Sequence, residues 1–587
     1  MNKAFKAIWS DVRQSFVTTS EIQPSHGKRS KASVSLSVAT VLLATSGLVS
    51  AAYVETGTLG DKASWETAEY NYNWGLGAMN ASSAYALGFY GQNTTTGVMD
   101  SGAWLGNPDL DTPRITATHV TGVYGSSGNR YPQSIYATIQ KGVVPTAAEG
   151  QPFTEGEEFD VKGDYTLGLN DAHGTQVTGV IGAERNGEYG HGVAFKANVV
   201  VGNTGATDNN NYGPFQDYNY YFKGYKALAD AVNAGNGEYR GGMVNNSYGT
   251  NTKIYSSGGH RLTPDEMSEL LAGSGNYDRA SAAYAVTFSG DYSFLGLNDV
   301  PGADQYSTNP SAFEWEYMYF KLKYGDKPSF LDGAYDAVKG TNVILSWAAG
   351  NQDRGTPYLK GLYPYFHPEA EKNWLNAVGV MQTRGDNDQY MQATYCKAGL
   401  AKWWSMSGPT AYPGIGTTYV TTDLENGRLT TTGFNGTSAS DPQISGAFTV
   451  LQSRYPSMTA IQVKDVMYTT ASHIGANGQP FTNWTAAEGT PDVIYGWGMP
   501  DLEKGMYGPG QFLDHFEYRL SEPLDVWSND ITEAGLQQRE KEDKAWMAAT
   551  KNGTEPDAGG EYTLGDDIVV LDGNLDFYDN AVSPEQG

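Results

Sequence analysis

The chain has a single cysteine, Cys396, among its 587 residues. One thiol cannot form an intrachain disulfide, and a cysteine-based metal site needs several thiolates close together. A disulfide scaffold and a cysteine zinc site are therefore excluded. We predict that Cys396 is a semi-buried thiol without a chemical role.

Basic residues are also scarce, with 38 Lys and Arg against 65 Asp and Glu, for a net charge of −27 and a pI near 4.6. Nucleic acids and anionic membranes bind through basic surfaces, so neither is an expected partner. The 72 glycines, 40 tyrosines and 18% charged residues are typical of a loop-rich, extracellular globular protein. The length indicates one large unit or two to four smaller ones.

The apolar and small-residue run Val34–Val49 is too short and too weakly apolar for a membrane span, which needs about 20 apolar residues. Lys28, Arg29 and Lys31 precede it, and Val49-Ser50-Ala51 has the small-x-small form of a signal-peptidase site. Residues 1–52 are therefore predicted to be a signal peptide with an unusually long basic segment before the apolar run. The protein is predicted to leave the cytoplasm.

Two catalytic patterns are missing. Lipases and esterases usually carry Gly-x-Ser-x-Gly, and many zinc proteases carry His-Glu-x-x-His. Neither occurs in the sequence. Their absence argues against both enzyme classes.

A candidate nucleophile stands in Gly436-Thr437-Ser438-Ala439-Ser440-Asp441-Pro442, between a glycine turn and an apolar run that begins at Gln443. A proline in the first turn fits a helix start here, so Ser438 is predicted near the positive end of a buried helix. That position favours an anionic transition state beside the hydroxyl. Taken alone, the stretch fits a turn and helix cap better than a catalytic site, because Gly-Thr-Ser occurs in many loops.

Two further candidates lie upstream. The predicted strand Thr96–Met99 ends at Asp100, and open α/β sheets place their active sites at the carboxyl ends of strands. His173 opens the apolar helix pattern His173-Gly174-Thr175-Gln176-Val177, where the positive helix end favours the neutral imidazole that a general base needs. We interpret other histidines, such as His119, His191 and His473, as surface or structural residues.

Five blocks in this order resemble the subtilisin-like serine proteases. They are the Asp100 strand, the His173 helix, Gly242–Gly249, Val343–Asn351 and the Ser438 helix. The resemblance covers about residues 74–505. It implies a parallel α/β sheet flanked by helices, and an endopeptidase with Asp100, His173 and Ser438 as its triad.

The resemblance also implies the roles of the other two blocks. Asn351 would donate its amide to the oxyanion, and Ser247, Tyr248 and Gly249 would pair with the substrate backbone. Ala348, Ala349 and Gly350 would form one wall of the specificity pocket. Structural calcium is common in this family, but no spacing locates a site, so we assign no metal and no cofactor.

The chain departs from the family pattern in several places. After Ser438 the family usually continues Met-Ala-x-Pro-His, whereas this chain has Ala439-Ser440-Asp441-Pro442-Gln443, and Gln176 stands where a second histidine is common. Insertions at about 104–165 and 250–333 separate the blocks, and the first region, to about residue 170, is predicted to be loop-rich. A helix of residues 78–87 and a capped helix after Thr459 are also predicted.

The long N-terminal segment resembles the extended signal peptides of Gram-negative autotransporters. This resemblance implies delivery to the cell surface or the extracellular space, and an outer-membrane barrel as a partner that these residues do not contain. We therefore expect an extended signal peptide at 1–52, a protease domain at 53–505, and a linker with the β-rich start of a β-helical stalk at 506–587. The alternative is a surface adhesin or binding module that keeps the fold without efficient catalysis.

Overall fold

The structure is a computed structural model, and it divides into two compact units, Met1–Ala52 and Tyr53–Gly587. The residues that it describes are 5–10, 15–20, 53–129, 152–164, 172–188, 190–204, 217–248, 328–351, 355–382, 390–392, 395–410, 420–423, 428–431, 433–487 and 489–507. Gly249, most of the insertion at 250–333 and the predicted stalk segment after residue 507 lie outside them. In the first unit, β1 (Phe5–Ser10) and β2 (Ser15–Ser20) pair as an antiparallel hairpin.

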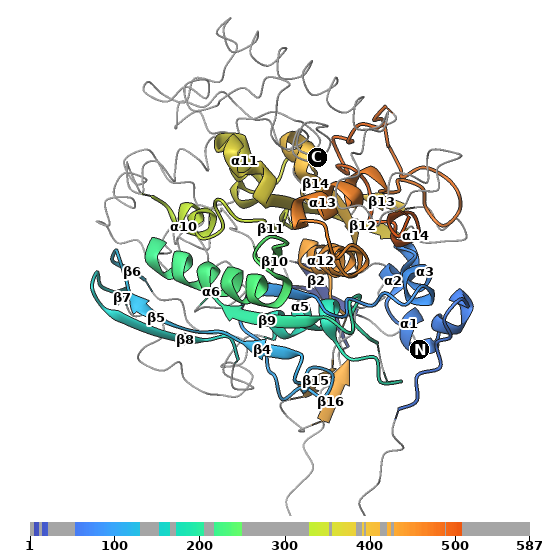
Figure 1. Ribbon diagram of the computed structural model, residues 1–587, viewed down its shortest axis with the longest axis horizontal. Helices are drawn as coiled ribbons and strands as arrows, with labels where there is room; N and C mark the ends of the chain where they lie inside the picture. The colour runs from blue at the N-terminus through green and yellow to red at the C-terminus, as the bar shows by residue number, and fades with distance from the viewer. Residues whose placement is uncertain are drawn as a thin grey trace, which may run out of the picture. The chain divides into compact units, whose positions relative to one another are not determined.

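The second unit is built on an eight-stranded sheet in the order β13-β12-β11-β10-β3-β9-β4, with β14 also paired to β12 (Figure 1). All pairs are parallel except β12 with β13. The predicted parallel α/β sheet is confirmed. Its strands are β3 (Thr95–Asp100), β4 (Ile115–Ala117), β9 (Asn198–Asn203), β10 (Gly242–Asn246), β11 (Val343–Ala348), β12 (Trp374–Gln382), β13 (Tyr390–Gln392) and β14 (Ser405–Pro409).

Helices cover both faces of this sheet. From β3 the chain runs to β4 at the edge of the sheet, then through a ribbon and α5 (His173–Gly182) to β9, and finally through α6 (Tyr218–Asn236) past β3 to β10. Val98 of β3 packs in the buried cluster that contains Val177 of α5, whereas the next residue, Met99, packs in the cluster that contains Leu228 of α6. Because successive strand residues point to opposite faces, α5 and α6 lie on opposite faces of the sheet. The strand order therefore reverses between β3 and β10, and open α/β sheets bind ligands beside such a point.

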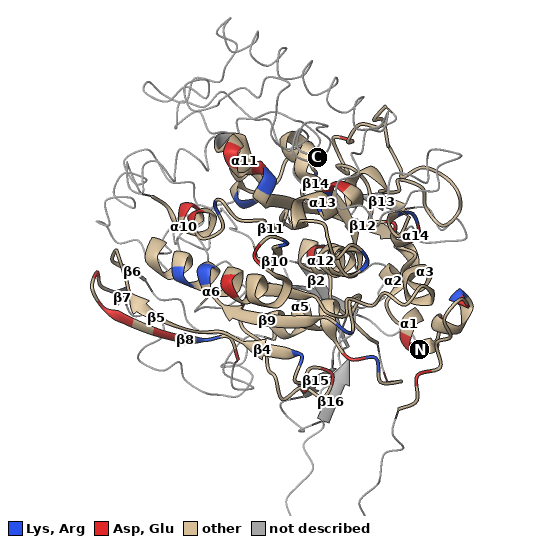
Figure 2. Ribbon diagram, viewed as in Figure 1, with Lys and Arg blue, Asp and Glu red and all other residues tan. Residues whose placement is uncertain are grey.

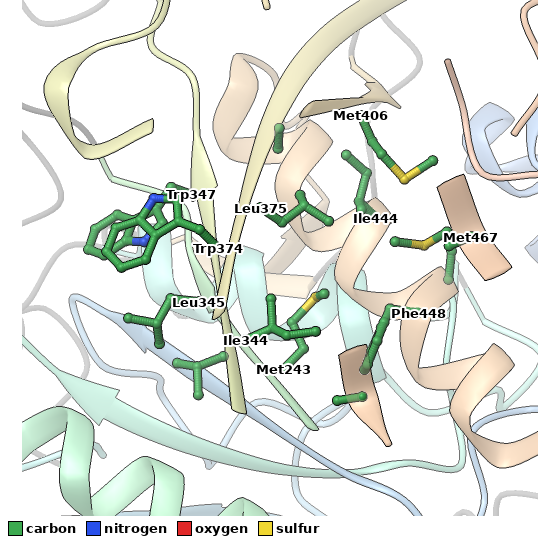
Figure 3. Packing of buried hydrophobic residues seen from close by; sticks show 14 of the residues in the cluster. Met243, Ile344, Leu345, Trp347, Trp374, Leu375, Met406, Ile444, Phe448 and Met467 are labelled. Carbon is green, nitrogen blue, oxygen red and sulfur yellow. The ribbon is translucent and has the colours of Figure 1, made fainter. Parts of the chain in front are cut away.

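Helix α12 (Thr437–Arg454) packs against α5 and against β10, β11, β12 and β14. Every residue from Thr437 to Gln452 is buried, so the helix is enclosed on all sides. Figure 3 shows Ile444 and Phe448 of α12 beside Met243 and Ile344 of the sheet, with none of these side chains exposed. Each large apolar side chain buried in this way contributes about 1.5–3 kcal/mol of transfer free energy, which fixes α12 on the sheet.

The described parts of the region 104–170, residues 104–129 and 152–164, contain more strand than predicted. Strands β5 (His119–Val123) and β8 (Glu158–Lys162) form an antiparallel ribbon, extended by β6 (Gly128–Asn129) and β7 (Pro152–Phe153). Acidic residues lie along β8 (Figure 2), while Phe159 turns inward to an edge-on contact with Tyr220 of α6. The loop prediction was wrong here because a two-stranded ribbon that buries few residues leaves little apolar periodicity in the sequence.

The helix predicted at 78–87 is two helices, α2 (Trp74–Ala78) and α3 (Ala81–Ala86). Asn80 between them has a φ of 55°, a left-handed conformation that interrupts a helix. The capping box of Thr459 and Gln462 is confirmed at the start of α13 (Ala460–Thr469).

The remaining described elements are α1 (Ala68–Asn71), α10 (Phe330–Asp336), α11 (Leu359–Phe366), α14 (Leu502–Gly505), β15 (Val420–Asp423), β16 (Arg428–Thr431) and the 3₁₀ turns Lys62–Trp65, Pro368–Asn373 and Gly399–Trp404. Within the described part of the chain, no helix has the length and apolarity needed to cross a bilayer.

Candidate active site

Asp100 and His173 form a hydrogen-bonded pair at the carboxyl end of β3. Asp100 is fully buried, and its Oδ1 lies 2.8 Å from His173 Nδ1 and accepts the Ser101 backbone N–H at 2.8 Å. The imidazole comes from the first residue of α5, and its side chain is 12% exposed. A carboxylate that accepts from Nδ1 leaves Nε2 as the nitrogen that can take up a proton.

The backbone holds this pair in place. The first N–H groups of a helix have no partner within the helix, and here the Gly174 N–H donates to Ser101 Oγ at 2.9 Å. The Trp104 N–H donates to Thr175 Oγ1, also at 2.9 Å. These two bonds tie the start of α5 to the segment after β3. No sequence pattern indicates this role for Ser101, because a serine after a strand is an ordinary turn residue.

Ser438 is the second residue of α12 and is 8% exposed. Its hydroxyl donates to the backbone carbonyl of Ser247, just beyond β10, at 2.8 Å. Pro442 is the sixth helical residue, not a first-turn residue as predicted, because the helix already begins at Thr437 after Gly436. Since proline has no N–H, the Ser438 carbonyl lacks its usual i+4 donor.

Asn351 lies beside the start of α12. Its Oδ1 accepts the Thr437 backbone N–H at 2.8 Å and the Thr437 hydroxyl at 2.9 Å. The Gly350 N–H in turn donates to Thr437 Oγ1 at 3.1 Å. Because Oδ1 faces Thr437 and accepts both of these bonds, the orientation of the amide is set, and its NH₂ group is the donor that Asn351 can offer to another group. Thr437 is thus a supporting residue that the sequence analysis did not identify.

The predicted substrate-binding residues lie at the same edge of the sheet. Ser247 and Tyr248 follow β10, while Ala348 ends β11 and leads to Ala349 and Gly350. The two strands are parallel neighbours, with Asn246 opposite Trp347. Gly350 has a φ of 119°, and a Cβ there would come within 2.4 Å of the Tyr358 ring, so the close packing requires glycine.

Asp441 is a further buried acid in this region, one helical turn after Ser438. It accepts hydrogen bonds from the Ser346 hydroxyl, from the Asn246 N–H at 3.2 Å and from the Ser247 hydroxyl at 3.4 Å. Burial raises the pKa of Asp441 to about 7, although these donors act in the opposite direction. In the sequence, Asp441 stands out only as a departure from a family pattern.

Cys396 is fully buried rather than semi-buried, and its backbone N–H donates to the Gly350 carbonyl at 3.0 Å. In the described part of the chain, no three His, Cys, Asp or Glu side chains gather as a metal site would require.

The model of the subtilase family matches residues 91–498, more than half of the chain, and spans the strand of Asp100, the helix of His173 and the helix of Ser438. The chain belongs to the subtilase family. A second model, the extended signal peptide of the type V secretion system, matches residues 1–50. This subtilase therefore carries an autotransporter-type signal peptide, and it is exported to the cell surface or extracellular space of a Gram-negative bacterium.

Two curated relatives agree with these matches. An extracellular serine protease of Serratia marcescens is 25% identical over 79% of this chain and 36% of its own length. The autotransporter lipoprotein NalP of Neisseria meningitidis is 23% identical over 42% of this chain and 21% of its own length. This chain therefore spans about a third or less of the length of these relatives.

Among solved structures, fervidolysin from Fervidobacterium pennivorans, a keratinolytic enzyme related to subtilisin, matches with a TM-score of 0.38 at 15% identity. The match covers 76% of this chain and 48% of fervidolysin.

Proposed function

We propose that this subtilase is an active serine endopeptidase with Asp100, His173 and Ser438 as its triad. The observation that carries the proposal is the 2.8 Å contact between His173 Nδ1 and Asp100 Oδ1, made between the end of β3 and the start of α5. Membership in a protease family and the position of Ser438 at the start of a buried helix support the same conclusion.

In the proposed reaction, Ser438 Oγ attacks the peptide carbonyl while His173 Nε2 takes the hydroxyl proton. Asp100 stabilises the imidazolium through Nδ1. The amide of Asn351 and the backbone N–H of Ser438 stabilise the tetrahedral oxyanion. The amine then leaves with the proton from His173, and water hydrolyses the acyl-enzyme by the same route.

The hydroxyl of Ser438 donates to Ser247 before substrate binds. A substrate strand that pairs with Ser247 and Tyr248 would supply a backbone N–H to the same carbonyl. The Ser438 proton could then be directed to His173. Substrate binding would in this way prepare the nucleophile.

The type V signal peptide fits a protease presented at the cell surface. Such proteins are carried by an outer-membrane translocator, which we propose as the partner of this chain. The substrates are protein chains or peptides exposed outside the cell.

Comparing Ser438→Ala with Ser440→Ala tests this proposal. Ser440 lies on the same helix, is fully buried, and its hydroxyl has no hydrogen-bond partner in the described structure. We expect a sulfonyl fluoride to label the wild-type protein at Ser438 and casein cleavage to be lost in Ser438→Ala alone. Cleavage that persists in Ser438→Ala would refute the triad, and a folded wild-type protein that neither cleaves nor is labelled would favour the adhesin alternative.

A further inference from the structure

We propose that Asp441 is a positioning residue that holds the Ser247 carbonyl in register with the nucleophile. This inference rests on the proposed peptidase function and extends it. Among the described hydrogen bonds, none joins the Asp441 side chain to Asp100 or His173.

Asp441 joins three parts of the site. It lies on α12, three residues after Ser438, so the two residues are neighbours along one side of the helix. Its Oδ2 accepts from the Asn246 N–H and the Ser247 hydroxyl at the end of β10, and its Oδ1 accepts from the Ser346 hydroxyl of β11. A single carboxyl group thus fixes the nucleophile helix to both strands that precede the predicted substrate-binding segments.

The Ser247 side chain is fixed from a second direction. Asn245 Nδ2 donates to Ser247 Oγ at 2.7 Å, and Asn245 Oδ1 accepts from the Ser445 hydroxyl of α12 at 3.0 Å. All of these side chains are buried. The Ser247 hydroxyl therefore accepts from Asn245 and donates to Asp441, which leaves the Ser247 carbonyl facing Ser438.

Burying an acid destabilises a protein unless the carboxyl is hydrogen-bonded or neutral, because an unpaired ionised carboxyl is disfavoured in an apolar interior. The negative charge of Asp100 on β3 opposes the ionisation of Asp441. A neutral carboxyl at this position would donate to Ser346 and still accept from Asn246 and Ser247. The role therefore depends on hydrogen-bond geometry, and an amide can replace the carboxyl.

If Asp441 has this role, its loss should affect two kinds of substrate differently. An extended peptide uses the Ser247 carbonyl for its backbone, whereas a small sulfonyl fluoride reacts with Ser438 without pairing to the strand. A displacement of about 1 Å in a positioning group can lower a rate by about 10²-fold. Loss of the Asp441 carboxyl should therefore damage peptide cleavage much more than sulfonylation.

The experiment compares Asp441→Ala, Asp441→Asn and the control Asp465→Asn in the full chain. Asp465 is another buried aspartate on a helix, and neither of its carboxyl oxygens has a hydrogen-bond partner in the described structure. For Asp441→Ala we expect kcat/KM for an extended peptide to fall by about 10- to 100-fold, while the sulfonylation rate changes by less than about 3-fold. Asp441→Asn should recover most of the peptide activity, and Asp465→Asn should resemble the wild type in both assays.

An equal fall of both rates in Asp441→Ala, or no fall in either, would overturn the proposal. Failure of Asp441→Asn to recover peptide activity would overturn it as well. If Asp441→Ala does not fold, Ser247→Ala removes the hydroxyl that contacts Asp441 and Asn245 while leaving the other Asp441 contacts in place, and it should show the same selective loss at a smaller size. A wild-type protein inactive in both assays would refute the peptidase function itself, which is a different outcome.

Discussion

The amide of Asn351 can be tested as an oxyanion donor. Its Oδ1 is occupied by Thr437, so the amide nitrogen is the group available to a developing negative charge. Because such a donor acts mainly in the transition state, Asn351→Ala should lower kcat by about 10²–10³ with little change in KM. The size is the one known for subtilisin, a member of the same family, and only the direction follows from the geometry here.

Measuring kcat, KM and the melting temperature of this variant separates two roles. If Asn351 merely holds Thr437 at the start of α12, the melting temperature should fall while kcat per folded molecule stays normal. That result would remove Asn351 from the oxyanion site.

The loop that carries Asn351 depends on the glycine before it. Gly350 has a φ of 119°, and its missing Cβ would overlap the Tyr358 ring, whereas Gly340 has a φ of 77° with no atom within 4 Å of its missing Cβ. Alanine at either position should cost about 1–2 kcal/mol of stability through backbone strain alone. Only Gly350→Ala should also displace the loop.

We therefore expect Gly350→Ala to lower kcat/KM by at least about tenfold and Gly340→Ala to leave it unchanged at temperatures where both variants are folded. Thermal unfolding and peptide cleavage measured on the same samples check this. Equal activities in the two variants would show that the Tyr358 contact does not control the loop.

At the scale of the molecule, buried ionisable groups make stability depend on pH. His191 is buried, accepts from Arg185 through Nε2 and donates from Nδ1 to the Gly192 carbonyl. Burial and the nearby Arg185 charge lower the pKa of His191 to about 3 from 6.5. Between these two values the unfolded chain binds the proton more readily, so the contribution of His191 is complete above about pH 6.5 and is lost as the pH falls toward 3.

Asp441 and Asp109 act in the opposite direction, because burial raises their pKa values to about 7 and about 6. Each favours the folded state more as the pH falls from these values toward about 4. The net pH profile of the wild type therefore mixes opposing terms, and a single-residue variant is needed to separate them.

His191→Gln replaces the acid-sensitive imidazole with an amide, which does not titrate in this range and offers both a donor and an acceptor. We expect the stability of the wild type relative to this variant to decrease between pH 7 and pH 4, by up to about 1.4 kcal/mol per pH unit below 6.5. Unfolding in denaturant at several pH values measures this difference. A difference that stays constant over the range would mean that His191 is not the group responsible.

Much of the fold could be predicted from local patterns. The apolar residues Val343, Ile344 and Leu345 that begin β11 are typical of a strand buried on both faces, and the capping box of Thr459 specifies where α13 begins. The β5–β8 ribbon could not be predicted, because its strands are held by pairing with each other and by a few contacts to α6. Domain boundaries and the catalytic roles of the site residues remain predictions.

The sequence by itself determined the family, the export signal and the identity of the candidate triad, because those depend on short motifs in a fixed order. Only the tertiary structure decided what holds the candidates together. Ser101, Thr437 and Asp441 are ordinary turn or helix residues in the sequence, and their contacts join segments 73 to 195 residues apart. Such contacts arise when parallel strands bring their carboxyl ends to one edge of the sheet, and no local pattern records them.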